Sequence, residues 1–173
     1  MSKRVSVVGS SGSGKTTLGK ALAVRLDVPF VELDSIFHQP NWTELPDDEF
    51  RARVREAVAG DAWVVDGNYA AVRPIVLGRA TKVVWLDYSR PRVMQQVIRR
   101  SVGRGITRQE LWNGNREDPR TWLDADHPIR WAWTHHARKR VEYEARYGSD
   151  EYAHLAVHRF RTPRETRAWL EVQ

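Results

Sequence analysis

The chain has 173 residues, with 28 Lys and Arg against 22 Asp and Glu, and it contains no cysteine. Its length suits one domain, and the missing cysteine excludes disulfides, thiolate metal sites and a cysteine nucleophile. No window approaches the ~18 uncharged apolar residues of a membrane span, and a strand-like run at the start of the sequence argues against a signal peptide. We therefore expect a cytoplasmic protein without a membrane partner.

The excess positive charge lies in residues 90–146, which hold 13 Lys and Arg against 7 Asp and Glu. Such a segment is a solvated helical face, a clamp for a polyphosphate or a nucleic-acid patch. We expect no nucleic-acid partner, although the charge leaves that interpretation open.

The N-terminal part of the chain predicts alternating strands and helices. A β-branched run at residues 5–8 indicates a buried strand. Leucines four residues apart, at positions 18, 22 and 26, indicate a helix that ends before Pro29. Residues 30–33 then indicate a second strand. Apolar residues at positions 50, 54 and 58 indicate a second helix.

The remaining part of the chain continues this pattern. Further strands are indicated at residues 62–65, 82–86 and 155–160. Helices are expected after Ser89, from Pro128 to just before Gly148, and from the capping-box residues 162–165 through Leu170. Because strands alternate with helices, the sequence predicts one α/β domain over residues 1–173, with a parallel sheet covered on both faces.

Residues 9–17 contain a phosphate-loop motif. The first eight fit G-x-x-x-x-G-K-[ST] without a mismatch, and we expect these eight and Thr17 to bind ATP. The eight are Gly9, Ser10, Ser11, Gly12, Ser13, Gly14, Lys15 and Thr16. The motif follows a predicted strand and opens a predicted helix, which is the context that nucleotide binding requires. Backbone N–H groups of such a loop and the helix N-terminus suit phosphate oxygens. Lys15 can reach the β- and γ-phosphates of ATP, and the Thr16 hydroxyl can ligate Mg²⁺.

Two carboxylates follow predicted strands. Asp34 follows the second strand and Asp66 the third, so both are expected at the sheet edge that carries the phosphate loop. Asp66 is a candidate Mg²⁺ ligand, through water, or a residue of an Asp-Gly turn. Asp34 is placed to orient or deprotonate an acceptor hydroxyl, or to cap a helix, and these two roles are compatible.

Six arginines gather at or beyond the end of the helix after the fourth strand: Arg99, Arg100, Arg104, Arg108, Arg116 and Arg120. Guanidinium groups that close over a transferred phosphoryl group match its negative charge. Arg100 and Arg104 are therefore candidate catalytic residues. A solvated basic helix is the alternative.

The pattern at residues 103–127 is irregular, and loops of that length are uncommon unless they are functional. We expect a mobile, arginine-bearing lid that excludes water from the site, at about residues 100–127. Residues 103–127 are expected to become ordered when nucleotide binds. The tryptophans of this region and the helix after it either pack the lid or stack a base: Trp112, Trp122, Trp131 and Trp133.

With these residues in place, the chain resembles the P-loop kinases of the adenylate-kinase-like group. More narrowly, it is similar to the family labelled topology modulation proteins or adenylate kinase-like proteins. The specific matches are D-G-N-Y at residues 66–69 and W-N-G-N-R-E at residues 112–117. The resemblance implies a three-layer, five-stranded nucleoside- and shikimate-kinase-like fold, an acceptor-binding region at about residues 35–60, and a lid at about residues 100–127.

The chain departs from true adenylate kinases at two places. Those enzymes have an Asp-Gly-aromatic-Pro-Arg segment after the third strand, whereas here D-G-N-Y stands there and Arg73 lies further along. The acceptor region carries aromatic side chains where a phosphate-binding arginine is usual: Phe37, His38 and Trp42. Both departures put AMP in doubt as the acceptor. Leu33-Asp34 resembles instead the strand-two aspartate of shikimate- and gluconate-type kinases, which holds an acceptor hydroxyl.

The resemblance also implies the remaining site residues. The expected substrate-binding residues are Asp34, Phe37, Trp42, Asp66, Asn68, Tyr69 and Arg116. Arg116 is the least expected to be catalytic, since it can pair locally. The adenine is expected against Arg161, after the last strand, unless Arg161 only flanks the closing helix.

The sequence therefore predicts a phosphotransferase that moves the γ-phosphoryl group of ATP to a small-molecule acceptor, a nucleotide or a hydroxyl compound, with Mg²⁺. The alternative is a nucleotide-binding regulator or a nucleic-acid-associated ATPase. The expected oligomeric state is a monomer or a homodimer.

Overall fold

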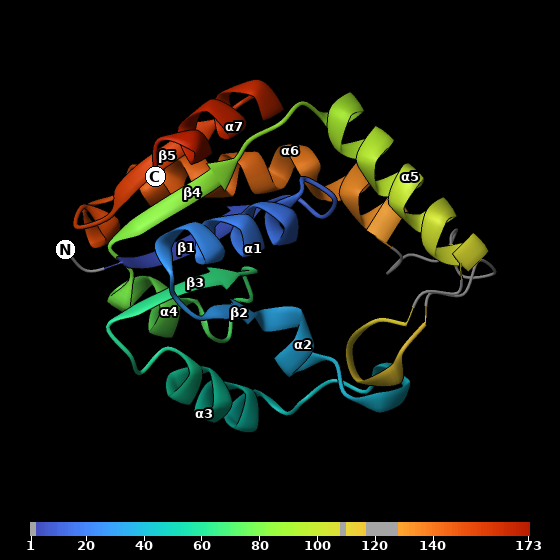
Figure 1. Cartoon of the computed structure of the whole chain (residues 1–173), viewed down its shortest axis with the longest axis horizontal. Helices are drawn as coiled ribbons and strands as arrows, with labels where there is room; N and C mark the ends of the chain where they lie inside the picture. The colour runs from blue at the N-terminus through green and yellow to red at the C-terminus, as the bar shows by residue number, and fades with distance from the viewer. Residues whose placement is uncertain (1–2, 108–109, 117–127) are drawn as a thin grey trace.

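The computed structural model of the chain describes residues 3–107, 110–116 and 128–173 (Figure 1). Within them, five parallel strands form one sheet in the order β2-β3-β1-β4-β5. The strands are β1 (Lys3–Gly9), β2 (Phe30–Glu32), β3 (Ala62–Asp66), β4 (Lys82–Leu86) and β5 (Ala156–Phe160). The predicted α/β fold with a five-stranded parallel sheet is therefore confirmed.

Helices connect the strands and cover the sheet (Figure 1). They are α1 (Lys15–Leu26), α2 (Leu33–Phe37), α3 (Asp47–Ala57), α4 (Arg73–Arg79), α5 (Arg90–Thr107), α6 (Pro128–Tyr147) and α7 (Pro163–Glu171). Short 3-10 turns lie at Pro40–Trp42, Trp112–Gly114 and Asp150–Tyr152. Of the helices in the described part of the chain, none has the length and apolar character needed to cross a bilayer.

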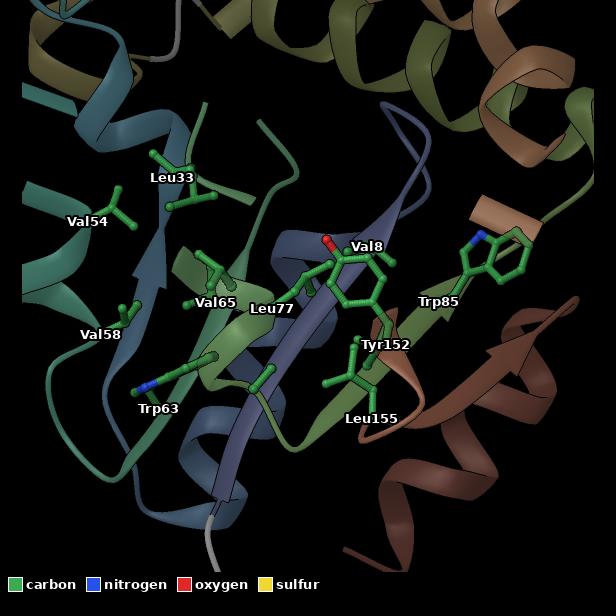
Figure 2. Close-up of a cluster of buried hydrophobic side chains, with 14 of the residues drawn as sticks. Val8, Leu33, Val54, Val58, Trp63, Val65, Leu77, Trp85, Tyr152 and Leu155 are labelled. Carbon is green, nitrogen blue, oxygen red and sulfur yellow. The ribbon is translucent and has the colours of Figure 1, made fainter. Parts of the chain in front are cut away.

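The apolar strand residues divide between the two faces of the sheet. Val5 and Val7 of β1 pack with α1, α5 and α7 on one face, and Val8 packs with α3 and α4 on the other. Figure 2 shows the second cluster, in which Val65 and Trp85 project from the strands. Each of these side chains is at most 3% exposed, and burying one contributes about 1.5–3 kcal/mol. The core therefore holds the sheet rigidly beneath the loops at its carboxyl edge.

Two short helices, α2 and α4, were not expected from the sequence. The second strand ends at Glu32, because Leu33 turns inward and begins α2. The region after β3 contains α4, with proline at its second position, where the sequence analysis expected only a turn. Helix α1 ends one residue before Asp27, whose left-handed φ of 54° stops it ahead of Pro29.

Helix α5 is longer than the sequence indicated, so the predicted placement of Arg99 and Arg100 at or beyond its end is wrong, whereas Arg104 does lie in its last turn. All three lie inside the helix, which continues to Thr107 through Gly103. Once a helix has formed, each added residue gains one backbone hydrogen bond, so a glycine weakens it without ending it. The Thr107 hydroxyl also donates to the carbonyl oxygen of Gly103 at 2.8 Å. The first part of the expected lid is therefore helical.

The remaining lid predictions are only partly covered by the structure. Residues 108–109 and 117–127, including Arg108, Arg120 and Trp122, lie outside the described residues. The part that is described, residues 110–116, contacts the acceptor region.

Candidate active site

The phosphate loop joins β1 to α1 in a conformation that requires glycine. Gly12 has a left-handed φ of 78°, and a Cβ atom there would lie 2.0 Å from Cγ2 of Val97 in α5. A Cβ atom on Gly9 would lie 2.8 Å from the carbonyl oxygen of Leu86. The loop is therefore pressed between β4 and α5, and at these two positions only glycine fits.

The polar side chains of Lys15 and Ser13 lie against the phosphate loop. The Lys15 ammonium group donates to the carbonyl oxygen of Ser10 at 3.1 Å. The Ser13 hydroxyl is buried and has no hydrogen-bond partner among the described residues. Buried polar groups without partners are costly, so an orphaned hydroxyl beside a lysine and a helix N-terminus suits an anionic oxygen ligand. Thr17, which was predicted to contact the cofactor, is exposed on the first turn of α1.

Asp66 and Thr16 meet at the edge of the loop. The Thr16 hydroxyl donates to Oδ2 of Asp66 at 2.5 Å. Asp66 is only 4% exposed, and its Oδ1 atom has no hydrogen-bond partner among the described residues. Burial raises the pKa of Asp66, while Lys15 and the Thr16 hydroxyl act against that increase. The prediction that these two side chains lie together is confirmed.

The donor set of Thr16 and Asp66 fits Mg²⁺, because both supply hard oxygen ligands. In the described part of the chain, no group of three or more His, Asp or Glu side chains is arranged to hold a metal ion. Mg²⁺ at this place would therefore take most of its ligands from water and from phosphate oxygens, as Mg²⁺ commonly does.

Asp34 lies in the first turn of α2 and is held by a tyrosine. Its Oδ1 atom accepts a hydrogen bond of 2.6 Å from the Tyr69 hydroxyl. The interpretation of Asp34 as a helix N-cap is wrong, since Glu32 occupies the cap position of α2. Burial, followed by the nearby charge of Asp34, raises the pKa of Tyr69. Tyr69 therefore stays protonated and fixes one oxygen of Asp34, which leaves the other oxygen for a ligand.

Aromatic rings surround this tyrosine. The ring of Phe37 lies 4.6 Å from that of Tyr69, and Phe50 lies 5.3 Å from it. Nε2 of His38 lies 3.5 Å from the Tyr69 hydroxyl. The predicted residues Asp34, Phe37 and Tyr69 are thus together, and His38 joins them.

Asn68 lies on the other side of the D-G-N-Y loop. Its Oδ1 atom accepts a hydrogen bond of 2.8 Å from Nε of Arg73 in α4. Arg73 and Arg146 in turn line an open depression of about 500 Å³ between α4 and α6, which none of the predicted site residues lines. Asn68 therefore supports the loop through Arg73.

The sequence analysis missed a contact between residues 110–116, here called the docking segment, and the acceptor region at about residues 35–60. In Figure 1 the docking segment, in yellow, lies beside the blue chain that follows α2. The Asn113 amide donates to the carbonyl oxygens of Ser35, at 3.2 Å, and His38, at 2.5 Å. Side-chain amides of this kind fix two segments without any apolar core between them.

Asn115 makes the second link. Its amide nitrogen donates to the carbonyl oxygen of Gln39 at 2.9 Å, and its Oδ1 atom accepts from the backbone N–H of Trp42 at 2.9 Å. The Asn115 side chain is 4% exposed, so both hydrogen bonds are shielded from water. Asn-Gly and Pro-Asn pairs are typical of turns, but nothing in either pair indicates the partner of the turn.

The docking segment completes an aromatic cluster. The rings of His38 and Trp112 are stacked 5.9 Å apart, and Trp42 lies edge-on to both, at 5.4 Å from His38 and 6.4 Å from Trp112. Trp42 is 41% exposed, so part of its ring faces solvent. Trp42 therefore contacts His38, and His38 in turn lies beside Tyr69, another predicted substrate residue.

The predicted arginines are placed differently from one another. Arg116 forms an ion pair of 3.7 Å with Glu110, so it does pair locally. Val97 of α5 packs on the phosphate loop, and Arg100 follows it by three residues on the same helix face. Arg104 lies one turn further along α5. Their roles in catalysis stay predictions.

Arg161 lies at the end of β5, beside the capping box of α7. Its Nε atom is 4.0 Å from Oδ2 of Asp87, and its side chain is 65% exposed. Asp87 is nearly fully buried and also binds Arg159, at 2.6 Å, and Arg140, at 3.1 Å. Arg161 is therefore free to turn toward a ligand, and its contact with adenine stays a prediction.

Comparisons with known proteins agree with this geometry. A family model for shikimate kinase matches residues 11–51. The chain is 34% identical over 123 residues to a shikimate kinase of Symbiobacterium thermophilum, and the match covers 62% of this chain and 68% of that protein.

Solved structures share the fold. A shikimate kinase of Bacteroides thetaiotaomicron superposes with a TM-score of 0.55 and 18% identity, covering 98% of this chain and 95% of the other. A gluconokinase of Sinorhizobium meliloti 1021 gives 0.53 and 18%, covering 99% and 93%. A shikimate kinase of Acinetobacter baumannii, solved in complex with shikimate, gives 0.54 and 18%, covering 97% and 88%. At this identity the three structures establish the fold.

Proposed function

The chain belongs to the shikimate kinase family of P-loop kinases, and we propose that it transfers the γ-phosphoryl group of ATP to a hydroxyl group of a small molecule. The observation that carries the proposal is the meeting of three elements at one sheet edge. The phosphate loop supplies Lys15 and Thr16, β3 supplies Asp66 within 2.5 Å of Thr16, and α2 supplies Asp34. Phosphate, metal and hydroxyl groups are thereby bound side by side.

In the proposed reaction Asp34 acts on the acceptor. The carboxylate oxygen of Asp34 that Tyr69 leaves free accepts the proton of the acceptor hydroxyl. At the same time the oxygen of that hydroxyl bonds to the γ-phosphorus. The bond between the γ-phosphorus and its bridging oxygen breaks, and ADP leaves with the electron pair. The hydrogen bond from Tyr69 keeps Asp34 oriented during this step.

Charge on the transferred group is balanced by groups of the chain. Lys15 lies over the phosphate loop, and Arg100 and Arg104 extend along α5 from the helix turn that packs on the loop. Thr16, and Asp66 through water, would hold Mg²⁺, which would supply further positive charge to the phosphates.

The narrower parts of the proposal rest on sequence. They include the resemblance to topology modulation and adenylate kinase-like proteins, carried by D-G-N-Y and W-N-G-N-R-E. They also include one domain, a monomer or homodimer, a cytoplasmic location, acceptor contacts by Arg116 and Asn68, and adenine against Arg161.

The test is ADP formation from ATP and Mg²⁺ with and without candidate acceptors. We expect hydroxyl compounds to stimulate ADP formation and to appear as phosphate esters by mass spectrometry. If instead DNA or RNA stimulates turnover and no small molecule does, the proposal is wrong and a nucleic-acid-associated ATPase takes its place.

A further inference from the structure

The open depression between α4 and α6 is lined by a different set of residues from the proposed active site. Its volume is about 500 Å³, and its lining includes Arg73 of α4, Arg146 in the last turn of α6 and Tyr152 of the turn that follows. Asp34, Asp66 and the phosphate loop are not part of that lining. Pockets of roughly 300–1,000 Å³ are typical of small-molecule sites. The depression is therefore large enough for a ligand of its own.

Two guanidinium groups of the depression lack acidic partners. Arg73 donates through Nε to Oδ1 of Asn68, which belongs to a neutral amide, at 2.8 Å. Nη1 of Arg146 is buried and has no hydrogen-bond partner among the described residues. Within the described ranges, neither arginine forms an ion pair with a carboxylate. Because a buried charged donor without a partner is costly, this pair of arginines suits an anionic ligand.

The two arginines also act on each other as like charges. Burial, followed by the charge of Arg146, lowers the pKa of Arg73. An anion between the two groups would relieve this repulsion. A phosphate group carries about −1.5 to −2 charges at pH 7, so it balances both arginines, whereas a carboxylate balances one. Guanidinium groups also bind phosphate oxygens through two parallel N–H donors.

Two carboxylates, Glu142 and Glu151, belong to the same lining. Glu142 is engaged by Lys139 at 2.8 Å and by Arg138 at 3.4 Å. Glu151 is exposed, so water and salt screen its charge. With the ion-pair partners of Glu142 included, four basic side chains stand against two acidic ones. The depression is therefore positive overall, and its positive charge without acidic partners lies at the two arginines.

We infer that the depression between α4 and α6 is a second anion site, which binds a phosphate group between Arg73 and Arg146. The inference goes beyond the proposed function, because these residues take no part in the transfer step. The phosphate group belongs to inorganic phosphate or to a phosphate monoester, which is also the kind of product that the proposed reaction releases.

The site is connected to the D-G-N-Y loop through Arg73. Asn68, the partner of Arg73, lies in that loop between Asp66 and Tyr69, two side chains of the proposed active site. An anion that holds Arg73 therefore also holds Asn68. Bound phosphate should accordingly make local opening of residues 66–69 less frequent.

Anion binding is measured on protein saturated with an ATP analogue and Mg²⁺, so that the phosphate loop is already occupied. Inorganic phosphate, glycerol 3-phosphate and acetate are titrated by calorimetry. Each phosphate compound should bind with a Kd at least about tenfold below that of acetate. The tighter of the two identifies the source, free phosphate or a monoester, and either result supports the site. No binding of either phosphate compound, or acetate binding as tightly as both, would overturn the inference.

Replacement of Arg146 assigns the binding to the depression. Arg146→Gln should raise the Kd of the tighter phosphate compound about tenfold or more. Arg146→Lys keeps the charge and loses the paired donors, so it should raise the Kd less. Arg25→Gln is the control, because Arg25 is exposed on α1 and donates to the carbonyl oxygen of Glu171. The melting temperature without phosphate shows that each variant is folded, and native affinity in Arg146→Gln would contradict the site.

Hydrogen exchange tests the connection to the loop. Saturating phosphate should slow exchange of the backbone amides of residues 66–69 about threefold or more in the native protein, and much less in Arg146→Gln. Equal slowing in both proteins would mean that phosphate acts on the loop from another place. None of these measurements uses phosphoryl transfer, so their outcome is independent of whether the proposed function holds.

Discussion

Lys15 is the residue on which the proposed chemistry depends most directly. Its ammonium group turns back to the carbonyl oxygen of Ser10, so it lies over the loop and outside both core clusters. A side chain placed in this way can be removed with little effect on packing, so its loss reports on ligand binding and transfer.

Lys15→Ala should lower phosphoryl transfer by about a hundredfold or more, because it removes positive charge from the transition state. Circular dichroism and the melting temperature should stay close to those of the native protein. Lys20→Ala is the control, since Lys20 lies on the same helix with a side chain that is 61% exposed. Transfer within about tenfold of the native rate would contradict the role of Lys15.

Asp34→Asn should lower kcat more than it weakens ATP binding. The amide fills the same space and can still contact Tyr69, but it cannot accept the proton of the acceptor. The Kd for an ATP analogue, measured by calorimetry, separates the two effects. Asp48→Asn serves as the control, because the Asp48 side chain is 98% exposed. A collapse of ATP affinity with an unchanged kcat would assign Asp34 to the metal site instead.

At the scale of elements, β5 and α7 close the sheet at one edge. His158 of β5 stacks near Phe160 and Trp169, with ring centroids 6.5 Å and 5.4 Å away. Burial, helped by the charge of Lys82, lowers the pKa of His158 below its ordinary value of 6.5. Helix α7 begins with the predicted capping box, which the structure confirms at Thr162 and Glu165.

The stability of the protein should fall as the pH decreases through and below about 6.5. The folded state holds His158 neutral, whereas the unfolded chain takes up a proton there. The unfolded state then binds more protons, so acid favours unfolding. In His158→Gln this part of the pH dependence should be absent from urea unfolding curves measured between pH 7 and 5. Parallel curves for the two proteins would show that His158 does not contribute.

Thr162→Ala should destabilise the protein by about 1 kcal/mol, because the hydroxyl oxygen accepts the N–H of Glu165 at the start of α7. Arg164→Ala, at an exposed position in the first turn of α7, is the comparison. Urea unfolding at pH 7 measures both. A free energy of unfolding that is the same in both variants would mean that the cap adds nothing.

Sequence patterns predicted the structure correctly where the residues of one strand or helix determine its conformation. All five strands were predicted because short apolar runs bounded by turn residues favour strands. Helix α2 is five residues long and α4 seven, too short to show a repeating apolar pattern. Thr16 and Asp66 could be placed together because strand ends of a parallel sheet share an edge. The bonds of Asn113 and Asn115 reach backbone carbonyls, which every residue has, so no pattern in the sequence points to them.

At the scale of the whole molecule, the acceptor region and the docking segment form one unit. The sequence predicted that residues 103–127 would become ordered only when nucleotide binds. Because residues 110–116 contact the acceptor region through buried hydrogen bonds, we now expect that part to be ordered without nucleotide.

Hydrogen exchange measures this expectation. Backbone amides of Trp42 and Asn115 should be protected in the nucleotide-free protein, and adding an ATP analogue with Mg²⁺ should change that protection little. In Asn115→Ala the amide of Trp42 loses its acceptor and should exchange about tenfold or more faster. Asp48→Ala in α3, whose side chain is 98% exposed, is the control. Protection that arises only with nucleotide would restore the original prediction.

The cluster of His38, Trp42 and Trp112 also has a consequence for the order in which the molecule assembles. Trp42 binds Asn115, a partner 73 positions away, so this contact requires closing a long loop of chain. The phosphate loop has the same requirement, because Gly9 and Gly12 pack on Leu86 and Val97. During refolding from urea, binding of an ATP analogue and acceptor-dependent turnover should therefore return together, and a phase in which nucleotide binds before any acceptor is turned over would contradict this.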